Sequence, residues 1–151
     1  PVSHGIMIES ITSCIACIGF AIVFNIHKRA ILLCAFGGGL TWLLYRLLGQ
    51  WSIGSIEAYF IATLFAATYS EIMARIRKQP AISYLVVSII PLLPGAGVYR
   101  ATFSIMNGDM AGFASSGKQT IAIAGAIAVG ILIISTFARL WSIYQQQKAG
   151  R

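Results

Sequence analysis

The stretch IIPLLPGAGVYRA, residues 89–101, interrupts an apolar run at 82–106 with two prolines and two glycines. Pro91 and Pro94 have no amide hydrogen, so the carbonyls four residues before them lose their usual helical donors. Glycine lowers the cost of leaving helical dihedral angles. Unpaired carbonyls in hydrocarbon cost several kcal/mol each, so such a break is tolerated only inside protein or beside a wet cavity. The sequence therefore predicts a broken helix that does not face lipid.

The composition is that of an integral membrane protein. Of the 151 residues, 58% are hydrophobic and 10% are charged, whereas a soluble domain carries about 25% charged residues. The net charge of +7 does not indicate nucleic-acid binding, because the basic residues lie between apolar runs rather than on one polar face. We expect one transmembrane domain over residues 1–151 in a lipid bilayer, with no nucleic-acid partner.

Five apolar segments approach the length of about 20 residues that a membrane-spanning helix needs. They are residues 8–26, 30–48, 56–74, 82–106 and 119–141. The stretch NGDMAGFASSGK (107–118) is predicted to be the longest polar connection, and the tail after the last span is predicted to be frayed. The predicted fold class is all-α: a polytopic membrane protein with about five transmembrane helices, the fourth broken at P-x-x-P-G.

The basic residues are unevenly placed between these segments. Residues 27–29, 75–78 and 139–151 hold most of them, and in a five-span chain all three lie on one side. The positive-inside rule makes that side cytoplasmic, so we expect the N-terminus outside and the C-terminus inside the cell inner (plasma) membrane. A re-entrant hairpin at 82–106 would place the basic tail outside the cell, against the positive-inside rule. The charge pattern therefore favours a single crossing with a break in it. Arg46 is the exception, and it is near enough to a helix end to reach the interface.

Three further patterns concern packing and location. The first ten residues contain no Lys or Arg, so we expect no signal peptide there. Small residues recur at four-residue spacing in the third and fifth segments, which predicts close helix packing: Ala62, Ala66, Ser70 and Ala74, then Ala122, Ala126 and Gly130. Four aromatic residues are predicted to form an outer interfacial belt: Trp42, Tyr45, Trp51 and Tyr59.

A break inside the bilayer also creates a new helix start with free N–H groups. The second half-helix begins near Pro94, and the amides of about 96–99 form the positive end of its dipole. Discontinuous helices of secondary transporters bind substrates in this way. Arg100 either assists an anionic substrate or extends to the interface. The predicted substrate-binding residues at the break are Pro91, Pro94, Gly95, Ala96, Gly97, Tyr99 and Arg100.

The alternative is a proline kink that only shapes the bundle. The motif P-x-x-P-G-x-G, with two prolines and two glycines close together, favours a functional break over a simple kink.

The other polar and reactive residues have simpler interpretations. Cys14 and Cys17 form a C-x-x-C, which we interpret as small packing residues rather than a redox pair. Glu71 and Arg75 have the spacing of an ion pair on one helix face; a role of Glu71 in proton coupling is the alternative. Asn25 is placed to cap the end of the first helix. Metal-site spacings and hydrolase or phosphate-loop motifs are missing, so we expect no metal, no cofactor and no enzyme activity.

Three stretches resemble the threonine/serine exporter family: GFAIVFNIHKRAILLCAFGG (19–38), RIRKQP (75–80) and IIPLLPGAGVYRA (89–101), the last followed by NGD. The resemblance is to the C-terminal half of that family and covers nearly the whole chain. It implies an inner-membrane exporter half with about five helices. The family pattern maps onto Asn25, Pro91, Pro94, Gly95 and Tyr99, which adds Asn25 to the predicted substrate site.

The resemblance also implies a partner and a substrate class. Fused members carry an additional N-terminal transmembrane half, and two-chain members pair a small chain with a larger membrane subunit. Some members are linked to dicarboxylate (succinate) export. We therefore expect the small subunit of an amino-acid or dicarboxylate exporter, in a homo- or hetero-oligomer. The alternative is a membrane structural or assembly subunit without a substrate site of its own.

Overall fold

The computed structural model describes residues 2–26, 28–51 and 53–149, and it confirms the all-α fold class. No strand occurs within these residues. The helices are α1 (Val2–Val23), α2 (Lys28–Gln50), α3 (Ser55–Arg77), α4 (Ala81–Ile89), the short 3-10 turn η1 (Ile90–Leu92), α5 (Gly95–Met106) and α6 (Met110–Ala149).

Three of the described helices are long and apolar enough to cross a membrane. They are Gly5–Val23, Ala30–Gln50 and Met110–Lys148. The segments Ala81–Leu92 and Gly95–Met106 meet the same test together as a pair bent by 49°, which makes up to four spans. The predicted segment 56–74 does form α3, but it does not meet this test of length and apolarity. Its inward face consists of small residues, and the two acids of the helix, Glu57 and Glu71, lower its hydropathy.

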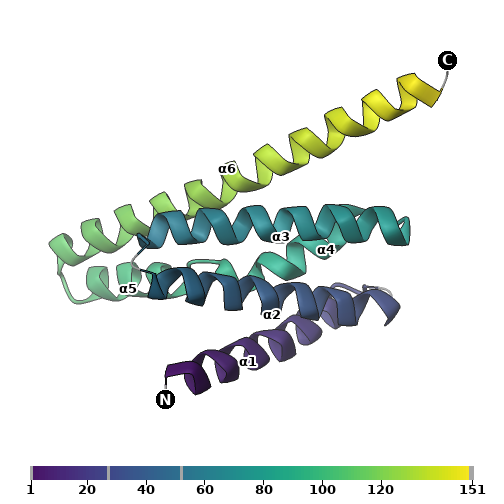
Figure 1. The fold of residues 1–151 in the computed structure, drawn as a ribbon. Helices are drawn as coiled ribbons and strands as arrows, with labels where there is room; N and C mark the ends of the chain where they lie inside the picture. Colours follow the sequence, from purple (N-terminus) through teal and green to yellow (C-terminus); the bar gives the residue numbers. More distant parts are fainter. Residues whose placement is uncertain (1, 27, 52, 150–151) are drawn as a thin grey trace.

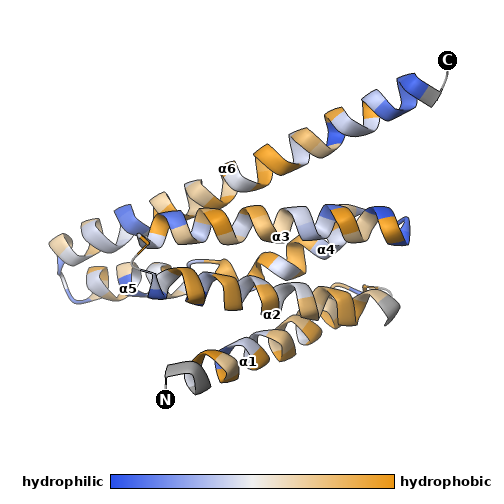
Figure 2. Cartoon of the chain, viewed as in Figure 1, coloured by the Kyte–Doolittle hydropathy of each residue, from blue (hydrophilic) through white to orange (hydrophobic). Residues whose placement is uncertain are grey.

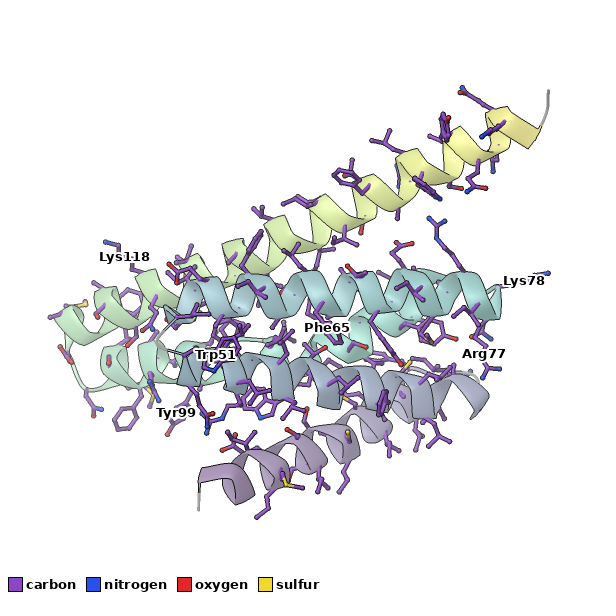
Figure 3. All side chains as sticks on the ribbon, in the orientation of Figure 1. Trp51, Phe65, Arg77, Lys78, Tyr99 and Lys118 are labelled. Carbon is purple, nitrogen blue, oxygen red and sulfur yellow. The ribbon has the colours of Figure 1, made fainter. Side chains whose placement is uncertain are left out.

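The helices form one bundle, with cationic side chains toward both of its ends. Helix α2 packs against α1, α3 and α4, while α6 packs against α3 and α5 and diverges from the bundle toward its C-terminal end (Figure 1). The start of α1 and the end of α6 lie at opposite ends (Figure 1). Hydrophilic residues gather toward the helix ends (Figure 2). Arg77 and Lys78 lie at one end, and Lys118 lies toward the other (Figure 3).

Small residues set the distances between these helices, as predicted. Gly37, Gly38 and Gly39 of α2 are buried, and a methyl group at Gly38 would contact the Cys17 sulfur of α1. A methyl group at Gly130 of α6 would lie 3.0 Å from Cγ2 of Thr63 in α3. The predicted face of α3 is buried throughout, with Ala62, Ala66, Ser70 and Ala74 at 8% exposure or less.

The predicted polar connection at 107–118 is wrong. The described chain turns within Asn107–Asp109, and α6 begins at Met110. Asp109 caps this helix, since its Oδ1 accepts a hydrogen bond of 2.9 Å from the amide of Gly112. This local cap outweighs the polar composition of the segment.

The predicted frayed tail is also wrong over residues 142–149, because α6 continues as a helix to Ala149, while residues 150 and 151 lie outside the described residues. A helix of 40 residues is about 60 Å long at a rise of ~1.5 Å per residue. The hydrocarbon core of a bilayer is only about 30 Å thick. Part of α6 must therefore extend beyond the bilayer core.

Candidate functional site

The predicted break in the fourth helix is present at P-x-x-P-G. Helix α4 tightens into the 3-10 turn Ile90–Leu92, and Leu93 then adopts extended dihedral angles, with φ −60° and ψ 130°. Pro94 has φ −77° and ψ 49°, and α5 starts at Gly95. The helix axis bends by 49° across this point.

The chain itself replaces the donors that the two prolines remove. The amide of Ile90 donates to the carbonyl of Val87, and that of Leu93 donates to the carbonyl of Ile90 over 3.1 Å. Cys17 of α1 adds a thiol hydrogen bond to the Val87 carbonyl, with a sulfur–oxygen distance of 3.4 Å. Both carbonyls are therefore satisfied by protein, and water is not needed to stabilise them.

The amides that follow the break are only partly free. Gly95 donates to the carbonyl of Leu93 over 2.7 Å, while Gly97 and Val98 both donate to the carbonyl of Pro94 over 3.1 Å. Within the described residues, the amide of Ala96 has no hydrogen-bond acceptor. One backbone donor rather than a full set is therefore available at the start of α5.

A cavity of about 310 Å³ lies against the break. Small-molecule pockets are of about 300–1,000 Å³, so this one suits a small solute. Its walls come from the break and from α2, α3, α5 and α6. The lining residues are Trp42, Tyr45, Ser55, Tyr59, Pro91, Leu93, Pro94, Ala96, Gly97, Arg100, Ser116, Gln119, Thr120 and Ile123.

Five of the eight predicted site residues line this cavity. They are Pro91, Pro94, Ala96, Gly97 and Arg100. Gly95 does not line it, although it is the first residue of α5. Tyr99 lies on the outer face of α5, where it is 69% exposed and stacks on Phe103; Figure 3 marks its position.

Asn25 is also outside the cavity and instead ends α1. It adopts a left-handed conformation with φ 52°, and the next amide, that of Ile26, bonds back to the carbonyl of Ala21. This is the hydrogen-bond pattern of a Schellman motif, in which Asn is one of the few side chains that tolerate the left-handed position. The predicted capping role of Asn25 is confirmed.

The aromatic wall of the cavity was not recognised in the sequence as part of a site. The ring centroids of Trp42 and Tyr45 are 5.3 Å apart, and those of Tyr45 and Tyr59 are 4.4 Å apart. All three are partly buried between helices, whereas Trp51, predicted to lie in the same belt, is 79% exposed. The spacing of Ser116, Thr120 and Ile123 on one face of α6 was the available signal for the opposite wall.

An ion pair lies next to the aromatic wall. Arg46 Nε is 2.7 Å from Oε2 of Glu9, and an Arg46 terminal nitrogen donates to Oε1 over 3.2 Å. The indole nitrogen of Trp42 donates to the same carboxylate over 3.3 Å. Arg46 is therefore held by a specific partner on α1, which its sequence position alone did not indicate.

The predicted pair between Glu71 and Arg75 is wrong. Within the described residues the only ion pair is that of Glu9 and Arg46. Arg75 instead donates to the carbonyl of Ala138 in α6 over 3.0 Å. The reason is that α6 packs beside α3 here and provides a carbonyl acceptor. The residue spacing within α3 contains no information about this neighbouring helix. Both Glu71 and Arg75 line a larger opening between α3, α4 and α6 at the end of the bundle that carries Arg77 and Lys78.

The cysteines act in packing, as predicted. Cys14, Cys17 and Cys34 are all free thiols, and Cys17 and Cys34 are fully buried. Cys14 and Cys17 face Gly39 and Gly38 of α2. Among the described residues, no cluster of His, Cys, Asp or Glu has the arrangement of a metal site.

The break and its cavity lie inside a region shared with known proteins. The family model described as "Threonine/Serine exporter, ThrE" matches residues 9–137. The chain belongs to the threonine/serine exporter family. The match includes α2 to α5 and most of α6, and therefore every residue that lines the cavity at the break. As a member of this family, the chain is a multi-pass membrane protein of a transport family.

One curated relative of this exporter-family chain is an uncharacterized protein of Haemophilus influenzae. The two are 26% identical over 136 residues, which cover 85% of this chain and 46% of the relative. The chain thus spans less than half the length of the curated relative that it matches. No solved structure matches it.

Proposed function

We propose that this chain is the small subunit of a bacterial secondary export system for amino acids or dicarboxylates, and that the cavity at the broken helix forms part of the substrate path. The observation that carries the proposal is one cavity of about 310 Å³. Five of the predicted site residues line it, together with polar side chains of α3 and α6. Polar groups that converge in a pocket between membrane helices are a recurring feature of transporter sites.

The cavity offers donors suited to a carboxylate. Arg100 supplies a permanent positive charge, and the amide of Ala96 supplies a backbone donor that has no acceptor in the described chain. The hydroxyl of Thr120 donates to the carbonyl of Ser116 over 2.7 Å, which leaves its lone pairs for an ammonium group. An amino acid or a dicarboxylate matches this combination of charge and hydrogen-bonding groups.

The proposed partner is a larger membrane subunit that resembles the N-terminal half of the exporter. The chain matches less than half of its curated relative, which leaves room for a second half of comparable size. In this assembly the N-terminus of the chain is outside the inner membrane and the C-terminus is cytoplasmic. The concentration of Arg77 and Lys78 at one end of the bundle supports that orientation (Figure 3).

The alternative is a structural or assembly subunit without a substrate site. Its specific support is the hydrogen bonding at the break, where both carbonyls that lose donors to proline are already satisfied by the chain. A break of this kind is stable without any ligand.

The two functions are distinguished by export from cells that express the chain with and without a candidate larger subunit. The decisive variant is Thr120→Val, which removes a cavity hydroxyl with little change of volume. Its control is Thr102→Val on the exposed face of α5, since each threonine donates to the carbonyl four residues earlier. The exporter proposal expects loss of amino-acid or dicarboxylate efflux for Thr120→Val alone. Equal efflux for the two variants, with both assembled, favours the structural subunit.

A further inference from the structure

Glu9 of α1 binds two side chains of α2. Its carboxylate accepts from Arg46 at 2.7 Å and 3.2 Å and from the Trp42 indole at 3.3 Å. Trp42 and Arg46 are four residues apart on α2, so both point to the same helix face. A single carboxylate of α1 therefore holds both side chains in one arrangement.

Trp42 lines two cavities. One is the 310 Å³ cavity at the break, and the other is a groove of about 360 Å³ lined by α1, Trp42 and the residues Ile90 and Pro91. Trp42 and Pro91 are the two residues that belong to both walls. Pro91 is part of the backbone of the broken helix, whereas the Trp42 side chain can turn about its own bonds. The indole is therefore the movable part of the wall.

We propose that Trp42 is the partition between the break cavity and the α1 groove, and that Glu9 is the positioning residue that keeps this partition closed. The bond to Glu9 fixes the edge of the indole, while the contact with Tyr45 supports its face. Loss of the carboxylate frees the indole to turn and joins the two cavities. The importance of this partition for export rests on the proposed function.

The charge of Glu9 explains why Arg46 belongs to the arrangement. The Arg46 and Glu9 side chains are 42% and 41% exposed, so more than half of each side chain is covered by other protein atoms. Arg46 binds the carboxylate with two nitrogens, which fixes its orientation as well as its charge. The oriented carboxylate then presents an oxygen to the Trp42 indole.

The test uses Trp42 as its own reporter. The chain has three tryptophans, and Trp51 and Trp141 are exposed, so Trp51→Phe/Trp141→Phe leaves Trp42 as the single emitter. Glu9→Leu is compared with Glu57→Leu in this background, with the protein in lipid nanodiscs. Glu57 is an exposed acid of the first turn of α3 and does not line either cavity. The measurements are the emission maximum and quenching by acrylamide.

We expect Glu9→Leu to shift the emission of Trp42 and to increase its quenching, and Glu57→Leu to leave both as in the parent. An unchanged spectrum and unchanged quenching in Glu9→Leu would overturn the proposal. If Glu9→Leu does not assemble, Glu9→Leu/Arg46→Leu carries the same test without an unpaired arginine. This measurement needs no substrate, so it does not depend on the outcome of any export assay.

An export assay tests whether the position of the Trp42 indole matters for transport, which the fluorescence measurement does not show. If the chain exports a solute, Glu9→Leu is expected to lose more efflux than Glu57→Leu. A freed indole with unchanged efflux would overturn the positioning role of Glu9 in transport while leaving the export proposal intact.

Discussion

Cys17 of α1 donates its thiol hydrogen to the carbonyl oxygen of Val87 in α4, over a sulfur–oxygen distance of 3.4 Å. This is the carbonyl whose usual donor is removed by Pro91. A residue 70 positions earlier in the chain thus helps to stabilise the break, because α1 and α4 both pack against the glycines of α2. The broken helix and the close packing of α1 are parts of one arrangement.

Cys17→Ala should destabilise the bundle by about 1 kcal/mol or somewhat more, through loss of a hydrogen bond and of a fully buried sulfur. Cys14→Ala is the control, since Cys14 is only partly buried and donates no hydrogen bond among the described residues. The measurement is the thermal unfolding midpoint in detergent. Equal midpoints for the two variants would show that the thiol does not support the break.

Pro91→Ala/Pro94→Ala should straighten the segment from α4 to α5, because two amides return to the helical hydrogen-bond pattern. Spin labels at Ile82 and Phe103, both exposed, report the change as a longer distance. If the bend contributes to a substrate site, export is lost while the protein still inserts and assembles. An unchanged distance would mean that packing, and not proline, maintains the 49° bend.

Gly130→Leu should weaken the contact between α3 and α6 by about 1–3 kcal/mol, since overpacking at a tight contact costs energy of this order. A first side-chain carbon at Gly130 would already lie 3.0 Å and 3.2 Å from two atoms of Thr63. Gly125→Leu is the matched control, because the space beside Gly125 is open for 4 Å. Detergent stability and oligomer size are measured. Ala126→Leu, at a partly buried position, should have an intermediate effect.

Arg100→Gln should reduce export of an anionic solute, because Arg100 is the one cation among the described residues that lines the break cavity. Lys118→Gln is the control, as Lys118 is an exposed cation toward the same end of the bundle and does not line the cavity. Efflux is measured in cells at matched membrane levels. Equal efflux for the two variants would assign Arg100 to the membrane interface rather than to the substrate.

The N-terminus should be outside and the C-terminus cytoplasmic, since α1 begins and α6 ends at opposite ends of the bundle, and Arg77 and Lys78 lie together at one of these ends. Paired reporter fusions, one active outside and one active in the cytoplasm, are made at each terminus. Reporters that place both termini on one side would contradict the predicted crossing number.

The break was predictable from the sequence because its cause is covalent. Pro91 and Pro94 lack an amide hydrogen in any surroundings, and Gly95 marks the new helix start that the structure shows. The small-residue face of α3 was predictable for a similar reason, since a period of four residues places Ala62, Ala66 and Ser70 on one side of any helix. Both features depend on the local chain alone.

Capping is a stronger local signal than polar composition at the start of α6. The segment after Asn107 is polar, yet Asp109 starts a helix there by accepting from the amide of Gly112. Asp109 is a residue type that favours the N-cap position, so the sequence does carry the signal for a helix that begins at Met110.

Only the tertiary structure decided three features: the ion pair of Glu9 with Arg46, the hydrogen bond from the Cys17 thiol, and the cavity that both Trp42 and Thr120 line. Each depends on which helices pack together and on their rotation about their axes. Hydropathy and periodicity determine that a segment is helical and which of its faces is small or apolar. They do not determine which other helix meets that face, because many pairings bury similar apolar area, and the choice among them depends on close side-chain fit across the whole bundle.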